Sequence, residues 1–483
     1  MRLKNKSTVT RRTFVVSSLS GAAAAMVPIS GLADSGPREF SLAAIPGNAR
    51  LLPEEYPQTP VWSYNGLVPG PEIRVRQGEH LRIEVENALA EETTVHWHGI
   101  RLPNAMDGVP YLTQPPISPG ERFVYEFDAM DAGTFWYHPH QRSFEQIGRG
   151  LYGALIVEEA DPPQVDRDIT WILDDWRLTE SAAISDDFGD LGDMSHAGRM
   201  GNTITVNGQV AETFDVEPGE RIRIRLINTA NARIFALDFE GHAPQIIALD
   251  GQPVEPHAPR GGVVLLGPAM RADLILDCTA RSGARTRVVD RAYRGNEYRV
   301  LDLSYGDTTL RETPPDWPVA LVANPLPEPD LTAARRHEVL FTGGMMGQMV
   351  ERQMGLSGSR GMMGGGMMRM QGERPGIWFV NGVAAEERIR DPFLTFDRNT
   401  SHILEITNAT AFAHPIHLHG HSFRVISRNG APTERQEWQD TVFISAAERV
   451  EIAFVADNPG DWMFHCHIAE HMAAGMMGII RVT

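Results

Sequence analysis

The chain has 483 residues, which is room for about three domains at roughly 150 residues each. Its composition, with 42% hydrophobic and 22% charged residues, is that of a soluble globular protein. The net charge of -18 argues against a nucleic-acid partner, which needs a basic face. Such acidity serves solubility in the first place, and attraction of cationic substrates such as metal ions is the alternative.

The first 33 residues are predicted to be an export signal. The paired residues Arg11 and Arg12 precede a short, alanine-rich apolar run that ends near Val27, and residues 31–33 fit a cleavage site. This pattern resembles a twin-arginine signal, and the run is too short to span a bilayer. We therefore expect a periplasmic protein that uses the twin-arginine export machinery. We expect the mature protein to be a monomer without a membrane anchor.

One phrase occurs three times along the rest of the chain. It opens with Asn-Gly, continues into an alternating apolar and polar run, and closes on Asn, at residues 65–87, 207–228 and 381–408. Alternation with a period of two predicts strands, and helical periodicity is scarce. The sequence therefore predicts an all-β fold of three tandem β-sandwich domains. The expected domain ranges are 38–160, 161–310 and 331–483.

Histidines recur at fixed offsets from the closing Asn of each copy. The positions six, nine and eleven residues later hold His414, His417 and His419 in the third copy, Thr93, His96 and His98 in the first, and Ile234, Leu237 and Phe239 in the second. The same three positions thus carry three histidines in the third copy, two in the first and none in the second. We interpret this as a metal-binding scaffold that is complete in the third domain, half kept in the first and lost in the second.

A second, independent alignment agrees with the first. Gly460 lies five residues before the motif 465–467 (His-Cys-His), and Gly133 lies five residues before 138–140 (His-Pro-His). Pro139 stands where the third domain has Cys466, and Phe144 stands where it has His471. The first domain therefore lacks one complete metal site.

Four His-x-His pairs predict one shared metal cluster. Residues i and i+2 of a strand face the same side, so each pair directs two imidazoles one way. The pairs are His96/His98, His138/His140, His417/His419 and His465/His467. A single pair of this kind is a weak signal, but four pairs at matching offsets indicate an eight-imidazole site. Three coppers that share eight imidazoles leave coordination positions open for dioxygen.

The cysteine between the last two histidines indicates a second metal site. The Cys466 thiolate points to the opposite side of its strand, where His414 and His471 are its natural partners. Met476 supplies a distant axial thioether, which completes the trigonal pattern that suits single-electron transfer. The competing thioethers are those of Met472 and Met477. The other cysteine, Cys278, lies in an apolar run and is expected to be a buried structural thiol.

The final strand connects the two predicted sites. Because His465 and His467 are covalent neighbours of Cys466, an electron from the sulfur reaches the eight-imidazole site through a few backbone bonds. With the fourth copper, the protein stores the four electrons that reduce dioxygen to water. The sequence thus predicts a copper oxidase, with Cys466, His465 and His467 as the electron path.

These residues resemble the multicopper oxidase family. The motifs at 96–99, 136–140, 414–420 and 465–476 match its four copper-binding motifs, and the resemblance spans the expected mature chain. It implies three cupredoxin domains with Greek-key topology, four coppers, and a trinuclear cluster between the first and third domains. By the family's pattern, type 2 copper takes His96 and His417, and the type 3 pair takes His98, His138, His140, His419, His465 and His467. Type 1 copper takes His414, Cys466, His471 and Met476.

Within that family, the chain resembles bacterial periplasmic copper-tolerance oxidases. A methionine-rich insert at 343–370 opens the third domain, and thioethers select Cu(I). Its methionines are Met345, Met346, Met349, Met354, Met362, Met363, Met367, Met368 and Met370. A flexible Gly/Met loop that only gates access is the alternative. Asp107 matches the acid that the family places beside the trinuclear cluster, and it is the candidate proton donor.

Two departures bear on the substrate. Met472 follows His471 where copper-tolerance enzymes often have an acid, and residues 410–413 lack the Asp and Met of a cuprous-ion port. The leading hypothesis is oxidation of Cu(I) to Cu(II) with dioxygen as the acceptor, in copper homeostasis. The alternative is a laccase that oxidises phenols or other small aromatics.

Overall fold

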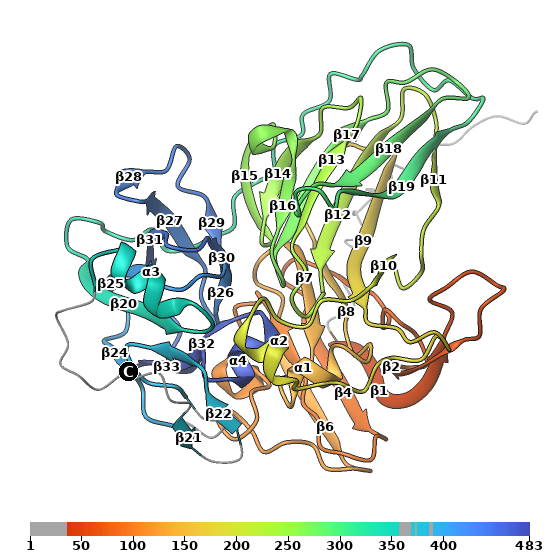
Figure 1. The fold of residues 1–483 in the computed structure, drawn as a ribbon. Coiled ribbons are helices and arrows are strands. Elements are labelled where there is room, and N and C mark those ends of the chain that lie inside the picture. The colour runs from red at the N-terminus through yellow and green to blue at the C-terminus, as the bar shows by residue number, and fades with distance from the viewer. Residues whose placement is uncertain (1–35, 357–368, 372–373, 386–389) are drawn as a thin grey trace, which may run out of the picture. The chain divides into compact units, whose positions relative to one another are not determined.

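The computed structural model describes residues 36–356, 369–371, 374–385 and 390–483. The predicted all-β fold is confirmed, since strands dominate and the helices are few and short (Figure 1). Within these ranges, no helix combines the length and apolar character needed to cross a bilayer. The predicted export signal lies outside the described residues. So do four methionines of the insert, Met362, Met363, Met367 and Met368.

Residues 38–158 form the first pair of sheets. One has the strand order β2 (Thr59–Tyr64), β1 (Arg38–Ala49), β4 (His80–Asn87) and β6 (Arg122–Asp128). The other has the order β3 (Ile73–Arg76), β8 (Gly153–Glu158), β7 (Gly133–His138) and β5 (His96–His98). The 3-10 helix η1 (Asn104–Met106) and the helix α1 (Ser143–Gln146) lie in the connections. Strand β5 lies at the edge of its sheet.

Residues 167–305 form the second pair. The first sheet has the order β10 (Thr203–Val206), β9 (Arg167–Trp176), β12 (Arg221–Asn228), β17 (Arg271–Asp277), β14 (Gln245–Leu249) and β15 (Gln252–His257). The second has the order β11 (Thr213–Val216), β19 (Tyr298–Tyr305), β18 (Arg285–Asp290), β13 (Phe235–Phe239) and β16 (Val264–Leu266). The helix α2 (Leu191–Ser195) and the 3-10 helix η2 (Arg260–Gly262) lie between strands.

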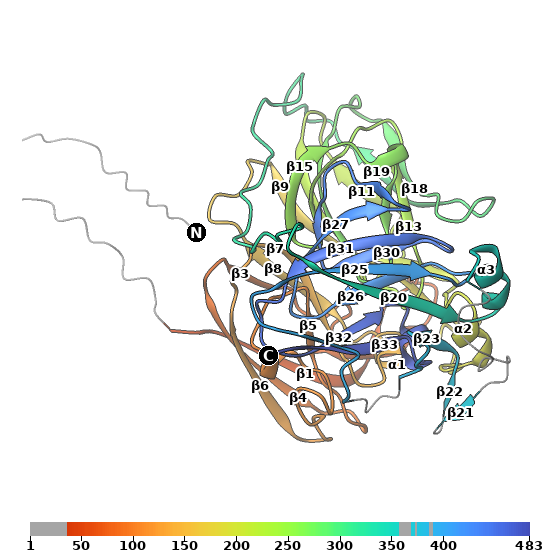
Figure 2. The same cartoon turned by 90° about the vertical axis from the view of Figure 1, so that its left-hand side faces the viewer.

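Residues 335–482 form the third pair. The larger sheet has the order β23 (Trp378–Val380), β20 (Arg335–Gly343), β25 (Ser401–Asn408), β31 (Arg449–Val455), β27 (Phe423–Arg428) and β28 (Ala431–Pro432), with β29 (Trp438–Gln439) also paired to β27. The other has the order β24 (Leu394–Phe396), β33 (Met477–Val482), β32 (Gly460–Cys466), β26 (His414–Leu418) and β30 (Thr441–Ile444). The insert contains α3 (Gly347–Gln353) and ends in β21 (Arg369–Gln371), which pairs with β22 (Arg374–Gly376). Figure 2 shows β20, β25 and β31 side by side.

The repeated asparagines play the same two structural parts in every copy. The opening residues Asn65, Asn207 and Asn381 have φ of 57°, 52° and 50° and precede glycines, so they form the tight turns that Asn-Gly favours. The closing residue accepts a hydrogen bond from the backbone N–H two residues later, at 3.0 Å in all three copies. These residues are Asn87, Asn228 and Asn408. Because this turn is common to all copies, the residues at fixed offsets after it occupy equivalent places.

Hydrophobic packing joins the first and last pairs of sheets. In β4 the apolar residues Leu81, Ile83 and Val85 are buried, as alternation predicts. One continuous core contains these residues together with Phe341 and Phe464 from the third pair of sheets. The short helices α1 and α2 both contact α4 (Ala469–Ala473), so segments from all three sheet pairs meet there (Figure 1).

Candidate metal centre

Four strands bring the eight paired histidines into one cluster. Strand register places His96 opposite His138 in the β5–β7 pair, and His417 opposite His465 in the β26–β32 pair. The two strand pairs then face each other across the contact between the first and third pairs of sheets. Ring centroids are 3.7 Å apart for His98/His417, 4.0 Å for His96/His419, 5.1 Å for His140/His465 and 5.1 Å for His138/His467. All eight side chains are buried.

The nitrogens that face the middle of the cluster fit bound metal. A buried polar atom without a partner is costly, so a set of them calls for a ligand. Within the eight paired histidines, six imidazole nitrogens lack a hydrogen-bond partner among the described residues: His96 Nε2, His98 Nδ1, His138 Nε2, His140 Nε2, His417 Nε2 and His467 Nε2. The remaining two, His419 Nε2 and His465 Nε2, face each other at 3.0 Å. Eight nitrogens therefore converge on a space that the protein itself does not satisfy.

Oxygen atoms of the protein fix the other nitrogen of most of these rings. Such a contact sets the tautomer and turns the free nitrogen toward the metal. The contacts are His96 Nδ1 to Asp107 O (2.7 Å), His98 Nε2 to Thr441 Oγ1 (3.1 Å), His138 Nδ1 to Pro139 O (3.0 Å), His417 Nδ1 to Asp440 O (2.9 Å), His419 Nδ1 to Asp107 Oδ2 (2.9 Å) and His465 Nδ1 to Cys466 O (2.9 Å). The rings are thus held in orientation before a metal binds.

Burial also keeps seven of these imidazoles neutral. It lowers the pKa of His465 to about 3, and it lowers the pKa of His98, His138, His140, His417, His419 and His467. Neighbouring imidazoles add to the effect, since a second positive charge nearby disfavours protonation. A neutral imidazole is the form that binds a metal, so no proton has to be displaced at neutral pH.

A second donor set lies on the opposite face of β32. Cys466 Sγ is 3.5 Å from His414 Nδ1 and 3.7 Å from His471 Nδ1, and the two nitrogens are 3.1 Å apart. A point equidistant from these three atoms lies about 2 Å from each, close to the roughly 2.0–2.3 Å of metal–imidazole and metal–thiolate bonds. The triangle therefore fits one metal ion in a trigonal site.

Among the nearby methionines, Met476 lies on the same side of β32 as the Cys466 thiol. Its carbonyl accepts a hydrogen bond from the Cys466 N–H at 3.0 Å, and its fully buried side chain belongs to the same core as Cys466. Met477 lies opposite His465 in the β32–β33 pair, and opposite residues share a face. Met472 and Met477 pack in a separate cluster with Val109. This arrangement favours Met476 over the two competing methionines.

Two buried acids hold the histidines of the cluster, and one of them has no signal in the sequence. Asp107 lies where the family resemblance places an acid, and its side chain and carbonyl bind His419 and His96. The other is Asp440, whose Oδ1 lies 3.3 Å from His98 Nε2 and 3.4 Å from His417 Nδ1. Asp440 follows β29 at no repeated offset, so only the folded chain reveals it.

Arg271 neutralises Asp440 from the middle domain. Its guanidinium donates to both carboxylate oxygens, at 2.5 and 2.8 Å. Burial alone raises the pKa of Asp440, but the charge and hydrogen bonds of Arg271 outweigh burial and hold that pKa below its usual range. Arg271 also donates to Thr134 O at 3.2 Å and contacts Asp250 at 3.4 Å. One buried cation therefore ties all three pairs of sheets together beside the cluster.

The acid beside His471 points away from the eight-imidazole cluster. Glu470 is fully buried, and its carboxylate accepts hydrogen bonds from the Arg199 N–H at 3.1 Å and from Asn231 Nδ2 at 3.2 Å. Burial raises the pKa of Glu470 to about 7. Met472 instead lines a small cavity beside His138, His140 and His465. Glu470 thus does not take the place of the missing acid after His471.

The methionine-rich insert begins close to the trigonal site. The Met345 N–H donates to Ser195 O at 2.9 Å, and the sequence continues to His196, whose carbonyl accepts a hydrogen bond from His471 Nε2 at 2.7 Å. Exposed fractions are 49% for Met345, 54% for Met346 and 50% for Met349. Met354 is partly exposed, and the backbone of Met370 lies in β21. His196 matches no repeated offset, so sequence patterns miss its contact with His471.

Comparisons with known proteins agree with this geometry. Three multicopper oxidase family models match residues 47–162, 167–282 and 366–483. Multicopper oxidase MmcO of Mycobacterium tuberculosis is 31% identical over 462 residues, which is 86% of this chain and 81% of the relative.

Solved structures match over nearly the whole chain. A multicopper oxidase from Pseudomonas thermotolerans is 35% identical with a TM-score of 0.80, over 93% of this chain and 100% of that one. A Campylobacter jejuni multicopper oxidase, described as a metallo-oxidase, is 25% identical with a TM-score of 0.76, over 94% of this chain and 93% of that one. The three domains are cupredoxin-like, as expected. The chain belongs to the multicopper oxidase family, whose members use four coppers to couple oxidation of a substrate to reduction of dioxygen.

Proposed function

We propose that the reducing substrate of this oxidase is Cu(I), which it converts to Cu(II) with dioxygen as the acceptor. The observation that carries the proposal is the exposure of Met345, Met346 and Met349 where the insert meets the residues around His471. Thioethers are soft, uncharged donors that select Cu(I) over harder cations. These three side chains are exposed, so packing in a core does not explain why methionines cluster here. Binding of a soft ion would explain it.

The donors around each site have distinct tasks in this reaction. Bound copper supplies one-electron redox chemistry at the trigonal site and binds dioxygen at the eight-imidazole cluster. His414, Cys466 and His471 would hold the first ion, and the buried thioether of Met476 would complete its donor set. The paired histidines hold the other three. By the family's pattern, His96 and His417 serve type 2 copper and the other six serve the type 3 pair.

Strand β32 links oxidation and reduction. Cys466 lies in one donor set, while its neighbours His465 and His467 lie in the other, so a few covalent bonds separate the two. Asp107 is the proposed proton donor for dioxygen reduction, because its buried carboxylate lies 2.9 Å from the His419 ring. In the balanced reaction, four Cu(I) ions, one dioxygen and four protons give four Cu(II) ions and two waters.

Oxidation of phenols, as in a laccase, is the alternative. Several relatives carry the name laccase, among them Laccase-1 of Botryotinia fuckeliana at 29% identity. The likeness to the Campylobacter jejuni enzyme, which is described as a metallo-oxidase, favours a metal-ion substrate for this chain instead. Steady-state oxygen consumption with Cu(I) and with hydroquinone separates the two proposals. We expect a higher kcat/KM for Cu(I), and a higher value for hydroquinone would refute the proposal.

Deleting residues 343–370 tests the role of the insert. We expect the deletion to lower kcat/KM for Cu(I) and to leave or raise that for hydroquinone, because a soft-donor surface is removed while the copper ligands stay. A deletion variant that oxidises Cu(I) at the full rate, with no gain for hydroquinone, would contradict this role. The visible absorption of the trigonal site serves as the control for intact folding.

The proposed location is the periplasm, where oxidation of Cu(I) would serve copper homeostasis. The support is the paired Arg11 and Arg12 before a short apolar run. Replacing both by lysine should leave the protein in the cytoplasm, as measured by cell fractionation. Unchanged export of the double variant would show that another route is used.

A further inference from the structure

A segment of the middle domain covers the trigonal site. We call residues 191–200, which comprise α2 and the turn after it, the domain 2 cap. Four hydrogen bonds join it to the third domain. They are His471 Nε2 to His196 O (2.7 Å), Trp378 Nε1 to Met194 O (2.6 Å), Met345 N to Ser195 O (2.9 Å) and Arg199 N to Glu470 Oε2 (3.1 Å). The cap is therefore bound to the surroundings of His471 through the segment from Met194 to Arg199.

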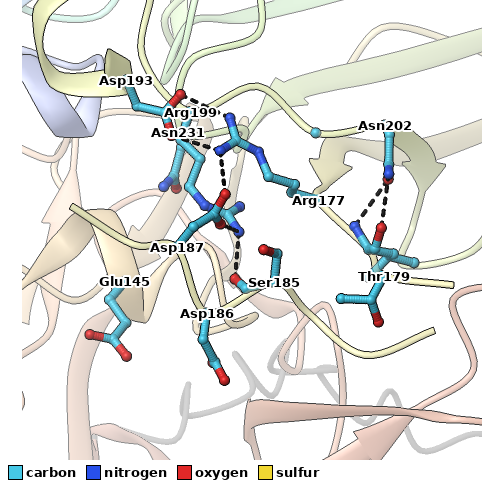
Figure 3. Close-up of polar contacts among 12 residues, drawn as sticks. Glu145, Arg177, Thr179, Ser185, Asp186, Asp187, Asp193, Arg199, Asn202 and Asn231 are labelled. Carbon is cyan, nitrogen blue, oxygen red and sulfur yellow. Dashed lines mark hydrogen bonds and ion pairs between the residues drawn. The ribbon is translucent and has the colours of Figure 1, made fainter. Parts of the chain in front are cut away.

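Charged side chains hold the cap in place from its other side (Figure 3). The Arg177 guanidinium donates to Asp193 at 2.7 and 2.9 Å and to Asp187 at 2.8 Å. Arg199 donates to Asp187 at 3.0 Å and to Ser185 O at 2.7 Å. Because the ion pairs form a network with partly buried members, they restrain the backbone more than an isolated surface pair would.

The cap closes direct access to His471. The ring presents Nδ1 to the trigonal site, and the protein's own carbonyl occupies Nε2. Trp378 packs against the same ring, with centroids 4.2 Å apart. An external donor therefore has no free nitrogen of His471 to bind. The 2.7 Å hydrogen bond from His471 Nε2–H to the carbonyl of His196 offers a route for an electron.

His196 has the features of a docking residue for the electron donor. It is exposed, and its Nδ1 is held by Gly192 O at 2.9 Å and by Ser195 Oγ at 3.0 Å. These contacts leave Nε2 as the nitrogen available to an external ligand. The backbone N–H of Met345 donates a hydrogen bond to Ser195 O, next to His196, and the Met345 side chain is exposed. A thioether is a soft donor and an imidazole also binds copper, so the two together form a donor pair that suits Cu(I).

We propose that His196 docks Cu(I), with a thioether of Met345 or Met346, and that the electron enters through its backbone. This inference rests on the proposed function, because it specifies where that substrate binds. The docked Cu(I) gives up one electron and leaves as Cu(II). The electron passes through the His196 carbonyl and the hydrogen bond to His471, and the type 1 site accepts it. Four such electrons reduce one dioxygen with four protons to two waters.

Chemical modification of the copper-loaded enzyme tests the docking site without turnover. Diethyl pyrocarbonate acylates exposed imidazoles, and Ag(I) mimics Cu(I) but donates no electron. We expect Ag(I) to protect His196 from modification, as read by peptide mass spectrometry. His80 is the internal control, because its side chain is 48% exposed and lies on β4, away from the insert and the trigonal site. Equal modification of His196 with and without Ag(I) would overturn the assignment.

The variants His196→Ala and Met345→Leu/Met346→Leu test the route kinetically. Both leave the His196 carbonyl and the copper ligands in place, so the visible absorption should stay unchanged. We expect KM for Cu(I) to rise about tenfold or more, the order expected when support of a metal site is lost. Values of kcat/KM for hydroquinone should stay within about twofold. His80→Ala should change neither.

The outcomes separate this inference from the function on which it rests. If wild-type enzyme prefers hydroquinone to Cu(I), the proposed function is wrong. If wild-type enzyme prefers Cu(I) but His196→Ala leaves KM for Cu(I) unchanged, the function stands and the docking site is wrong. An equal loss for Cu(I) and hydroquinone also overturns the docking site, because it indicates a general disturbance of the cap.

Discussion

Replacing Arg271 by methionine should both destabilise the protein and loosen its copper cluster. The Arg271 and Asp440 side chains are 0% and 1% exposed, and two hydrogen bonds of 2.5 and 2.8 Å join them. Methionine fills similar space but leaves the Asp440 carboxylate without its cation. Breaking a buried pair in this way costs about 3–5 kcal/mol, because the remaining charge is neither solvated nor paired.

The unfolding free energy in urea, measured on copper-free protein, gives this cost. Arg481→Met is the matched control, since Arg481 forms a pair with Asp461 in which the side chains are 39% and 27% exposed. Such a surface pair contributes about 0–1 kcal/mol. The double change Arg271→Met/Asp440→Asn removes the stranded charge and should recover part of the loss. A cost for Arg271→Met no larger than that of the control would refute the reasoning.

Copper binding should weaken in the same variant. Asp440 positions His98 and His417 from behind, and loss of such support lowers metal affinity about 10- to 100-fold. Copper retained per chain after dialysis against a chelator measures this effect. Arg271 lies in the middle domain and acts on the histidines only through Asp440. Unchanged copper retention would therefore show that its role is only structural.

Two further predictions concern buried acids. Burial raises the folded-state pKa of Glu470 to about 7 from 4.5, so between these pH values the folded wild type keeps a proton that the unfolded chain has lost, and its unfolding free energy falls by about 3 kcal/mol as pH rises through the window. Glu470→Gln should remove this pH dependence, as measured by urea unfolding across the window. A variant whose unfolding free energy has the same slope with pH as the wild type would contradict this. Asp107→Asn should lower kcat for oxygen consumption by about 100-fold or more, while anaerobic reduction of the trigonal site keeps its rate. Equal slowing of both steps would rule out a role of Asp107 in proton delivery.

The sequence predicts the copper ligands well because they lie on short strands after a repeated turn. Asn87 and Asn408 form the same turn, so counting from them locates His96 and His417 at equivalent places. Strand alternation then separates Cys466 from its two neighbours. The turn and the alternation of strand side chains are both set by residues close in sequence. Packing between domains does not change them.

Contacts between domains follow no such rule. Arg223 and Arg225 alternate with apolar residues in β12 and resemble a solvated strand face, yet both are buried and paired with acids. The neighbouring domain covers that face of β12. The sequence pattern of a single strand does not indicate which surface will pack against it. Asp440 and His196 were missed for the same reason, because each acts on histidines far away in the sequence.

Strand β32 carries the central claim, that neighbouring side chains bind two copper sites on its opposite faces and connect them. Oxygen consumption by a Cys466→Ser variant that retains the copper of the eight-imidazole cluster tests this most directly. The predicted result is loss of the strong visible absorption together with loss of turnover for every reducing substrate. Oxygen consumption near the wild-type rate, without the visible absorption, would mean that electrons reach the cluster by another path.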